Sequence, residues 1–220
     1  MKSCPYPSGL EKAYVSSVVL DERDGKMVVI KRIDKRAREI ERLFHNTLRA
    51  RKLPAMTAVI KKEELWLDYI SNAKTLGENL TKHMVKRVGA AVADMHKISV
   101  PAVFIFTDGV DIKFKKWSDF IKETIVYGSE RQNKRHGFDK KTTLAIIKQL
   151  SAFNFNEPVN PVLLHGDLHS DNILIANDEI YIFDPAYWVI GGDPFYDLAL
   201  LAINLNDELL SAFIEGYGYD

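Results

Sequence analysis

The sequence predicts an α+β fold, in which antiparallel strand pairs accompany amphipathic helices. The first strand pair is formed by Tyr14–Leu20 and Met27–Ile33, two apolar runs on either side of an Asp-Gly turn signal. The segment Lys82–Ile98 carries apolar residues at helical spacing along one stripe. A chain of 220 residues is long enough for one large domain or for two small lobes around a cleft.

Composition excludes several classes of protein. Basic and acidic residues both number 30, so no overall field favours a nucleic-acid or an anionic membrane partner. The one cysteine, Cys4, excludes an internal disulfide framework and fits a reducing compartment. The N-terminus has no signal-peptide core, and no apolar run approaches the roughly 18 residues of a membrane span. We therefore expect a cytoplasmic protein that binds neither nucleic acid nor membrane.

The N-terminal third is predicted to contain one helix and a second strand pair. Asp34–Leu53 has an apolar stripe with charges elsewhere, which indicates an amphipathic helix. Ala58–Ile60 and Leu65–Leu67 flank a charged turn and are predicted strands. The capping box Thr75–Glu78 precedes the long helix that begins at Lys82.

The second half of the chain is predicted to be mainly helical. Helices are expected at Trp117–Glu130, Lys140–Phe153, Phe195–Leu205 and Glu208–Gly216, and a tight turn at Gly191–Pro194.

The residues that carry the chemistry lie between a buried strand, Val162-Leu163-Leu164, and Asp184. The strand runs into the sequence H-G-D-L-H-S-D-N at 165–172. Two further apolar runs, Ile173–Ile175 and Ile180–Phe183, flank a polar turn and predict a hairpin. A histidine, two carboxylates and an amide therefore lie at the ends of short strands.

These residue types, in this order, suit phosphoryl transfer from ATP, which requires mainly positioning and charge neutralisation. Asp167 can orient and deprotonate the attacking hydroxyl. Asn172 and Asp184 offer the hard oxygen ligands that Mg²⁺ prefers. The spacing is that of the kinase catalytic loop, with glycine in place of arginine. We expect Asp167 to be catalytic, Asn172 and Asp184 to bind the metal, and ATP and Mg²⁺ to be the cofactors.

The same loop, with F-D-P-A at 183–186 and G-G-D-P-F-Y-D-L-A at 191–199, resembles the aminoglycoside phosphotransferase and fructosamine kinase family. Its members are small-molecule kinases with a protein-kinase-like fold. The resemblance implies an N-terminal nucleotide-binding lobe at 1–70, built from a small antiparallel sheet and a helix. It implies a mainly helical catalytic and acceptor-binding lobe at 71–220, and a chain trimmed at both ends.

The resemblance also implies how the phosphates are held. Lys31 would bind the α- and β-phosphates, and the following helix would carry its glutamate partner. Glu39 is the better match to the family's R-E start, and Glu41 is the alternative. These two lie about 200° apart on a helix, so only one can face the lysine. Pro5–Ala13 either forms a short phosphate-covering loop or leaves the phosphates less covered.

Three further expectations follow from the resemblance. Adenine is expected to bind backbone groups of a hinge-like passage formed by Asp68, Tyr69 and Ile70. His165 and Asp197 are expected to support the catalytic loop, and His96 to be a hydrogen-bonded core histidine. His169 and Asp171 receive no role.

The expected acceptor is a hydroxyl of a small molecule, such as a sugar, an amino sugar or a glycated amine. Asp184 and Asp197 lie too close in sequence for the long regulated segment of a protein kinase, which ends in Ala-Pro-Glu. Two alternatives stay open: a minimal protein kinase acting on Ser or Thr, and a nucleotide-binding protein without catalysis. A homodimer is possible, because a second subunit could close the acceptor side.

Overall fold

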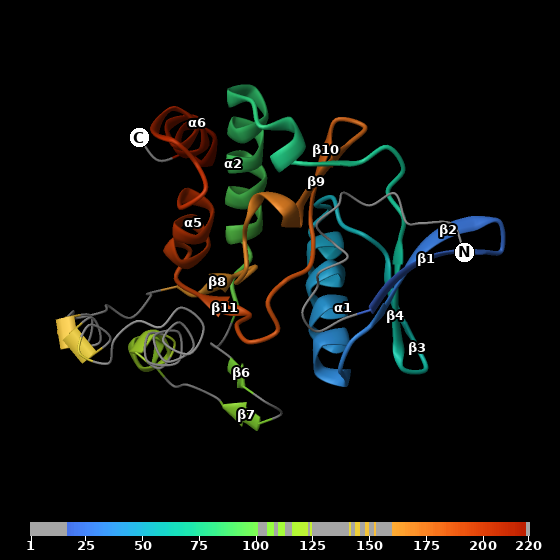
Figure 1. Ribbon diagram of the computed structural model, residues 1–220, viewed down its shortest axis with the longest axis horizontal. Helices are drawn as coiled ribbons and strands as arrows, with labels where there is room; N and C mark the ends of the chain where they lie inside the picture. Colours follow the sequence, from blue (N-terminus) through green and yellow to red (C-terminus); the bar gives the residue numbers. More distant parts are fainter. Residues whose placement is uncertain are drawn as a thin grey trace.

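The computed structural model confirms the α+β architecture with a sheet-and-helix part and a mainly helical part (Figure 1). It describes residues 17–100, 105–107, 110–112, 116–122, 124, 141, 144–145, 148–149, 152 and 160–218. The expected phosphate-covering loop, Pro5–Ala13, lies outside these residues. Within the described residues, no helix combines the length and the apolarity that a bilayer span requires.

Four strands form the N-terminal sheet: β1 (Ser17–Arg23), β2 (Lys26–Arg32), β3 (Ala58–Lys61) and β4 (Glu64–Asp68). Their order is β1-β2-β4-β3 and all neighbours are antiparallel. Asp24 and Gly25 form the first turn at φ angles of 53° and 73°, the left-handed values that an Asp-Gly pair tolerates. The predicted turn is shortened because Asp21, Glu22 and Arg23 still pair with β2.

Helix α1 (Lys35–Ala50) packs against this sheet and faces the rest of the molecule (Figure 1). The Asp34 carboxylate caps it by accepting from the backbone N–H groups of Arg36 at 2.9 Å and Ala37 at 3.0 Å. The buried stripe of the helix comprises Ala37, Ile40, Glu41, Phe44, His45 and Leu48. Two polar side chains therefore lie on the buried face of α1.

The remaining elements lie in the second part of the molecule, together with the long helix α2 (Lys82–His96). They are β5 (Lys74–Thr75), η2 (Gly77–Asn79), β6 (Ile105–Thr107), β7 (Val110–Ile112), β8 (Val162–Leu163), η3 (Ser170–Asn172), β9 (Ile173–Ala176), β10 (Glu179–Ile182), β11 (Gly191–Gly192), α5 (Phe195–Ala202) and α6 (Asp207–Tyr217). The helix predicted from Trp117 is helical at residues 117–122, and most of the following residues lie outside the described part. Helices α2 and α6 pack side by side at Gly216, where an added Cβ would lie 1.8 Å from the Lys86 carbonyl oxygen (Figure 1).

Two local predictions are corrected by the structure. The Thr75–Glu78 capping box forms, but its reciprocal hydrogen bonds surround the 3₁₀ turn η2, whereas Thr81 caps α2. The predicted tight turn at Gly191–Pro194 is wrong at its first half, because Gly191 and Gly192 form β11 and pair with β8. A Cβ at Gly192 would lie 2.0 Å from the Trp117 ring, so this strand requires the small residue.

The two parts share an apolar cluster that fixes their junction. Leu174 of β9 and Phe183, just after β10, pack with Val29, Leu65 and Leu67 of the N-terminal sheet. The residue after Phe183, Asp184, is therefore brought to Lys31 of the inner strand β2. The predicted division between residues 70 and 71 falls between β4 and β5, and we retain it as a proposal.

Candidate active site

Asp197 of α5 holds the loop after β8 through hydrogen bonds to its backbone. This buried carboxylate accepts from the backbone N–H groups of His165 and Gly166, both at 2.7 Å, and lies 3.2 Å from Nε2 of His96. Gly166 has a φ of 79°, and an added Cβ would lie 2.4 Å from Val189. Through these two hydrogen bonds Asp197 can support the loop, which is the role that the family resemblance implied for it. His96 is the expected core histidine, which also contacts the Tyr217 hydroxyl at 2.8 Å.

His165 connects this loop to the end of β10. Its buried ring lies with Nε2 2.7 Å from the carbonyl oxygen of Phe183, and Nδ1 accepts from the backbone N–H of Asp167 at 3.3 Å. This assigns the Nε2–H tautomer. Burial lowers the pKa of His165, which favours the neutral ring. His165 therefore fixes the backbone of Asp167 and that of Phe183, the residue before Asp184.

Asparagine at position 197 should lower both stability and activity. The amide has one acceptor oxygen for two converging N–H groups, so one buried donor loses its partner at about 1–3 kcal/mol. We expect a fall in Tm of about 3–10 °C for a chain of this size, measured by thermal unfolding. Asp193→Asn is the matched control, because its Oδ1 only caps Phe195 N at 2.9 Å and asparagine caps equally well. A Tm and turnover equal to wild type for Asp197→Asn would show that the loop is held by other contacts.

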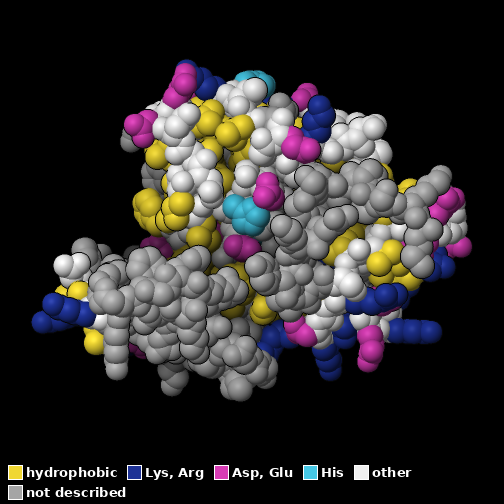
Figure 2. All heavy atoms as spheres, in the orientation of Figure 1, with side chains coloured by type: hydrophobic (Ala, Val, Ile, Leu, Met, Phe, Trp, Pro, Cys, Tyr) yellow, Lys and Arg dark blue, Asp and Glu magenta, His cyan; other side chains and the backbone are white. Residues whose placement is uncertain are grey.

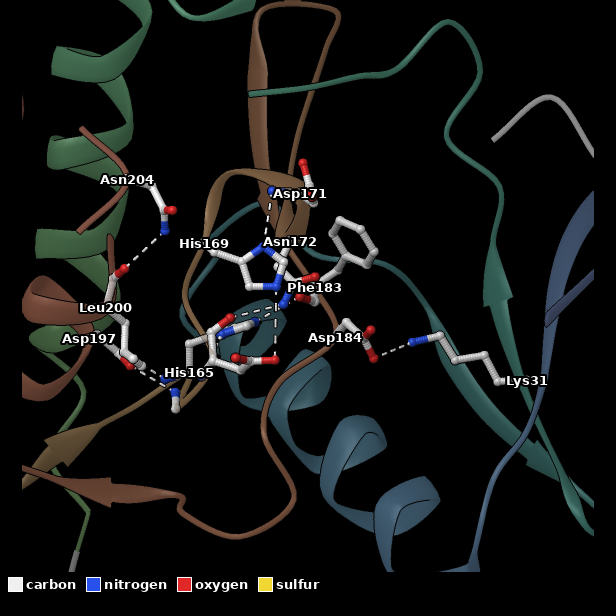
Figure 3. Close-up of polar contacts among 12 residues, drawn as sticks. Lys31, His165, His169, Asp171, Asn172, Phe183, Asp184, Asp197, Leu200 and Asn204 are labelled. Atoms are coloured by element: carbon white, nitrogen blue, oxygen red, sulfur yellow. Dashed lines mark hydrogen bonds and ion pairs between the residues drawn. The ribbon is translucent and has the colours of Figure 1, made fainter. Parts of the chain in front are cut away.

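Figure 3 shows the two residues expected to bind the metal, Asn172 and Asp184, with Asp184 pointing toward Lys31 of the N-terminal sheet. The side chains of Asp167 and Asp184 are 49% and 43% exposed, so both reach solvent. Asn172 is buried, and its Nδ2 donates to the Asp167 carbonyl oxygen at 2.9 Å, which leaves Oδ1 as an acceptor. Asp184 has a φ of 60°, a left-handed value that is strained for a residue with a Cβ.

Lys31 links the two parts through a buried ion-pair network. Its Nζ donates to Glu41 Oε1 and to Asp184 Oδ1, both at 2.7 Å, and Lys31 and Glu41 are only 5% and 3% exposed. Burial alone would lower the pKa of Lys31, but the carboxylates of Asp184 and Glu41 raise it. Burial alone would raise the pKa of Asp184, but Lys31 lowers it below its usual range. Lys31 and Asp184 are therefore both charged at neutral pH.

The expectation that Glu39 pairs with Lys31 is wrong. The Glu39 side chain is 49% exposed and forms an ion pair with Arg42 at 2.6 Å, on the outer face of α1. Glu41 lies on the buried stripe of the same helix and takes the place of Glu39. The separation of about 200° between the two positions explains why only Glu41 reaches the lysine.

His169 is a candidate site residue that sequence reasoning missed. Its Nδ1 accepts from the backbone N–H of Asp171 at 3.3 Å, which leaves Nε2 as the N–H, 3.9 Å from Asp167 Oδ2. Burial raises the pKa of Asp167, and the histidines at 169 and 165 oppose that rise. Figure 2 shows a histidine and acidic side chains close together near the centre of this face of the molecule. The signal in the sequence was its position two residues after Asp167.

The passage that was expected to bind adenine, Asp68, Tyr69 and Ile70, lies at the end of β4. Asp68 ends β4, and its Oδ2 accepts from the backbone N–H of Thr57 at 3.0 Å, so this side chain holds the start of β3. Tyr69 and Ile70 are half-buried beside it. A role in nucleotide binding stays a prediction for all three residues.

The oxygen donors at this site fit a magnesium ion that has both protein side chains and phosphates as ligands. Asp184 offers a carboxylate and Asn172 an amide oxygen, which are hard donors. Among the described residues, no group of three or more His, Cys, Asp or Glu side chains could hold a metal by itself. Mg²⁺ in phosphoryl-transfer sites takes one or two protein ligands and completes its shell with phosphates and water.

The small antiparallel sheet carries a lysine that pairs with a glutamate of the following helix. The same lysine contacts Asp184, which follows the loop that carries Asp167 and Asn172. This arrangement defines a protein-kinase-like phosphotransferase fold. The chain belongs to the phosphotransferase enzyme family, whose model matches residues 31–220.

Individual proteins support the same placement. The chain is 34% identical over 91 residues to the probable ketoamine kinase YniA of Escherichia coli, which covers 41% of this chain and 31% of that protein. The aligned part therefore spans less than a third of that relative. A crystal structure from Thermobifida fusca, described as a fructosamine-3-kinase, matches with a TM-score of 0.63 at 20% identity, covering 91% of this chain and 79% of that one. Spectinomycin phosphotransferase APH(9)-Ia, in complex with ADP and spectinomycin, matches with a TM-score of 0.63 at 19% identity, covering 94% and 71%.

Proposed function

We propose that the protein is an ATP- and Mg²⁺-dependent kinase that phosphorylates a hydroxyl group of a small molecule. The observation that carries this proposal is the Lys31–Asp184 ion pair, which joins residues 153 positions apart at 2.7 Å. It brings a phosphate-binding cation and a metal-binding carboxylate to one place, next to the exposed Asp167. Few functions other than phosphoryl transfer require that combination.

The residues divide the work between nucleotide and acceptor. Lys31, held by Glu41, binds the α- and β-phosphates. Asn172 Oδ1 and Asp184 would hold Mg²⁺, which when bound neutralises charge on the phosphates. Asp167 accepts a hydrogen bond from the acceptor hydroxyl and takes its proton as the phosphoryl group transfers. The Asp167 carboxylate is exposed enough to contact an acceptor. The backbone N–H and carbonyl groups of Asp167 are both hydrogen-bonded, which holds the residue in place.

The acceptor class proposed is a sugar, an amino sugar or a glycated amine. The described path from Asp184 to Asp197 is occupied by Ala186, Val189 and β11, which pack beneath the catalytic loop. This short path has no room for the regulated segment of a protein kinase. The names of the ketoamine kinase relative and of the spectinomycin phosphotransferase agree with a small polar acceptor. The possible homodimer stays a prediction.

A coupled ADP-release assay tests the proposal. The purified chain is given MgATP and a panel of glycated lysine, simple sugars, aminoglycosides and choline. We expect ADP release that depends on one acceptor class and stops when EDTA removes the metal. Labelled phosphate found in protein bands rather than in small polar products would favour the minimal protein kinase. Failure to bind nucleotide at all would refute the kinase proposal.

A further inference from the structure

The histidine at position 45 is buried in α1 without a hydrogen bond. The residue is 0% exposed, and neither ring nitrogen has a partner within the described part of the protein. Its one ring contact of note is the edge of Phe44, with centroids 5.8 Å apart at 75°. Buried polar side-chain atoms in native proteins are nearly always hydrogen-bonded, so this exception requires an explanation.

The explanation suggested by the geometry is Glu41, one helical turn earlier on the same face. His45 Nε2 lies 3.9 Å from Glu41 Oε1, and this oxygen already accepts from Lys31 at 2.7 Å. A distance of 3.9 Å is too long for a hydrogen bond, but a closure of about 1 Å would form one. Residues four positions apart on a helix are neighbours, so a small change in the side chains is sufficient.

We propose that His45 is a positioning residue for the nucleotide site, which donates from Nε2–H to Glu41 Oε1 when nucleotide is bound. The inference rests on the proposed function, in which Lys31 binds the phosphates. In the structure Lys31 is held between two carboxylates, Glu41 and Asp184, at equal distances. Phosphates would draw the lysine away from Asp184, and Glu41 would then have to hold it. A second donor on Oε1 fixes the carboxylate in the orientation that keeps Lys31 in reach of the phosphates.

A purely structural role predicts a different residue at this position. Apart from Glu41, the buried residues of α1 near His45 are apolar and include Phe44 and Leu48. An aliphatic side chain would fill such a space without leaving polar atoms unsatisfied. A histidine used only for packing would therefore be replaceable by leucine with no loss of stability and no change in nucleotide binding.

The test compares His45→Leu, His45→Gln and Leu48→Ala with the wild-type chain. Leucine removes both nitrogens, glutamine restores a donor near the position of Nε2, and Leu48→Ala disturbs the same buried stripe without touching Glu41. Thermal unfolding gives Tm, and calorimetric titration with Mg²⁺ and AMP-PNP gives Kd. We expect His45→Leu to keep or raise Tm and to bind about fivefold more weakly, the effect of one net hydrogen bond. His45→Gln should recover most of the affinity, and Leu48→Ala should lower Tm with Kd within about twofold of wild type.

Two outcomes would overturn the inference while leaving the proposed function in place. The first is that the wild-type and His45→Leu chains bind AMP-PNP with the same Kd. The second is a Leu48→Ala chain that loses as much affinity as His45→Leu, which would mean that any loosening of α1 weakens binding. A wild-type chain that does not bind AMP-PNP would overturn both the inference and the proposed function.

Discussion

Replacement of Asp167 by asparagine should lower kcat by about 10²- to 10⁴-fold and leave the Kd for MgATP nearly unchanged, because general-base catalysis contributes an effect of that size. The backbone of Asp167 is hydrogen-bonded on both sides, to His165 and to Asn172, and these bonds survive the substitution. The asparagine therefore occupies the same place with no proton-accepting carboxylate. Steady-state turnover with an acceptor identified in the panel, together with nucleotide titration, separates the two quantities.

Asp171→Asn is the matched control for that prediction. Asp171 lies in the same loop and is exposed, and the bond it makes to His169 comes from its backbone N–H, which asparagine retains. Its kcat should stay within about twofold of wild type. Because burial raises the pKa of Asp167, and a base must be deprotonated, kcat/KM of the wild type should fall with decreasing pH through a value above the ordinary aspartate pKa of about 4. Normal turnover by Asp167→Asn would refute the assigned mechanism.

The parts of the fold that the sequence predicted are those set by local rules. The hairpins β1–β2, β3–β4 and β9–β10 each combine two apolar runs with a turn, and α1 and α2 each show an apolar stripe. The loop at 165–172 and the aspartate at 184 were found because their spacing is itself the signal. The support of that loop by Asp197 came from the resemblance to a family, since no local rule links residues 165 and 197.

The parts that were missed depend on contacts distant in sequence. Gly191 and Gly192 look like a turn, but β8 is available to pair with them and Trp117 leaves space for no Cβ at Gly192. The capping box at Thr75 closes a short 3₁₀ turn, and Thr75 itself lies in β5, which pairs with β9 about 100 residues later. The unpartnered ring of His45 leaves no trace in the sequence, because burial and hydrogen bonding are properties of the folded state.

The choice between Glu39 and Glu41 shows how a motif match can mislead. The match to an R-E start favoured Glu39, whereas the apolar residues Ile40 and Phe44 define the buried face of α1. Glu41 adjoins Ile40 on that face, so burial outweighs the motif. The apolar residues of a helix together decide which face is buried. A charged residue on that face is buried with them.

Glu41→Gln should therefore weaken both the fold and nucleotide binding. The substitution preserves the shape of the side chain but removes one of the two negative charges that balance the buried Lys31 ammonium. Hydrogen bonds to charged groups contribute about 1.5–3 kcal/mol, so we expect the free energy of unfolding to fall by about 2 kcal/mol. Asp184 would then be the remaining carboxylate of the network and would hold Lys31 away from the phosphates. Denaturant unfolding and titration with Mg²⁺ and AMP-PNP measure the two effects, and we expect binding to weaken about tenfold, the equivalent of about 1.4 kcal/mol.

Glu39→Gln on the same helix provides the control for this prediction, because its ion pair with Arg42 is exposed on the outer face. Exposed ion pairs contribute about 0–1 kcal/mol, so stability should change by less than about 0.5 kcal/mol and nucleotide affinity should not change. The two glutamates differ in burial and in partner but not in chemistry, and the comparison therefore isolates the contact with Lys31. If Glu39→Gln weakened nucleotide binding more than Glu41→Gln, the rotation of α1 about its axis would be wrong. In that case the buried network that joins α1 to Asp184 could not be the phosphate site.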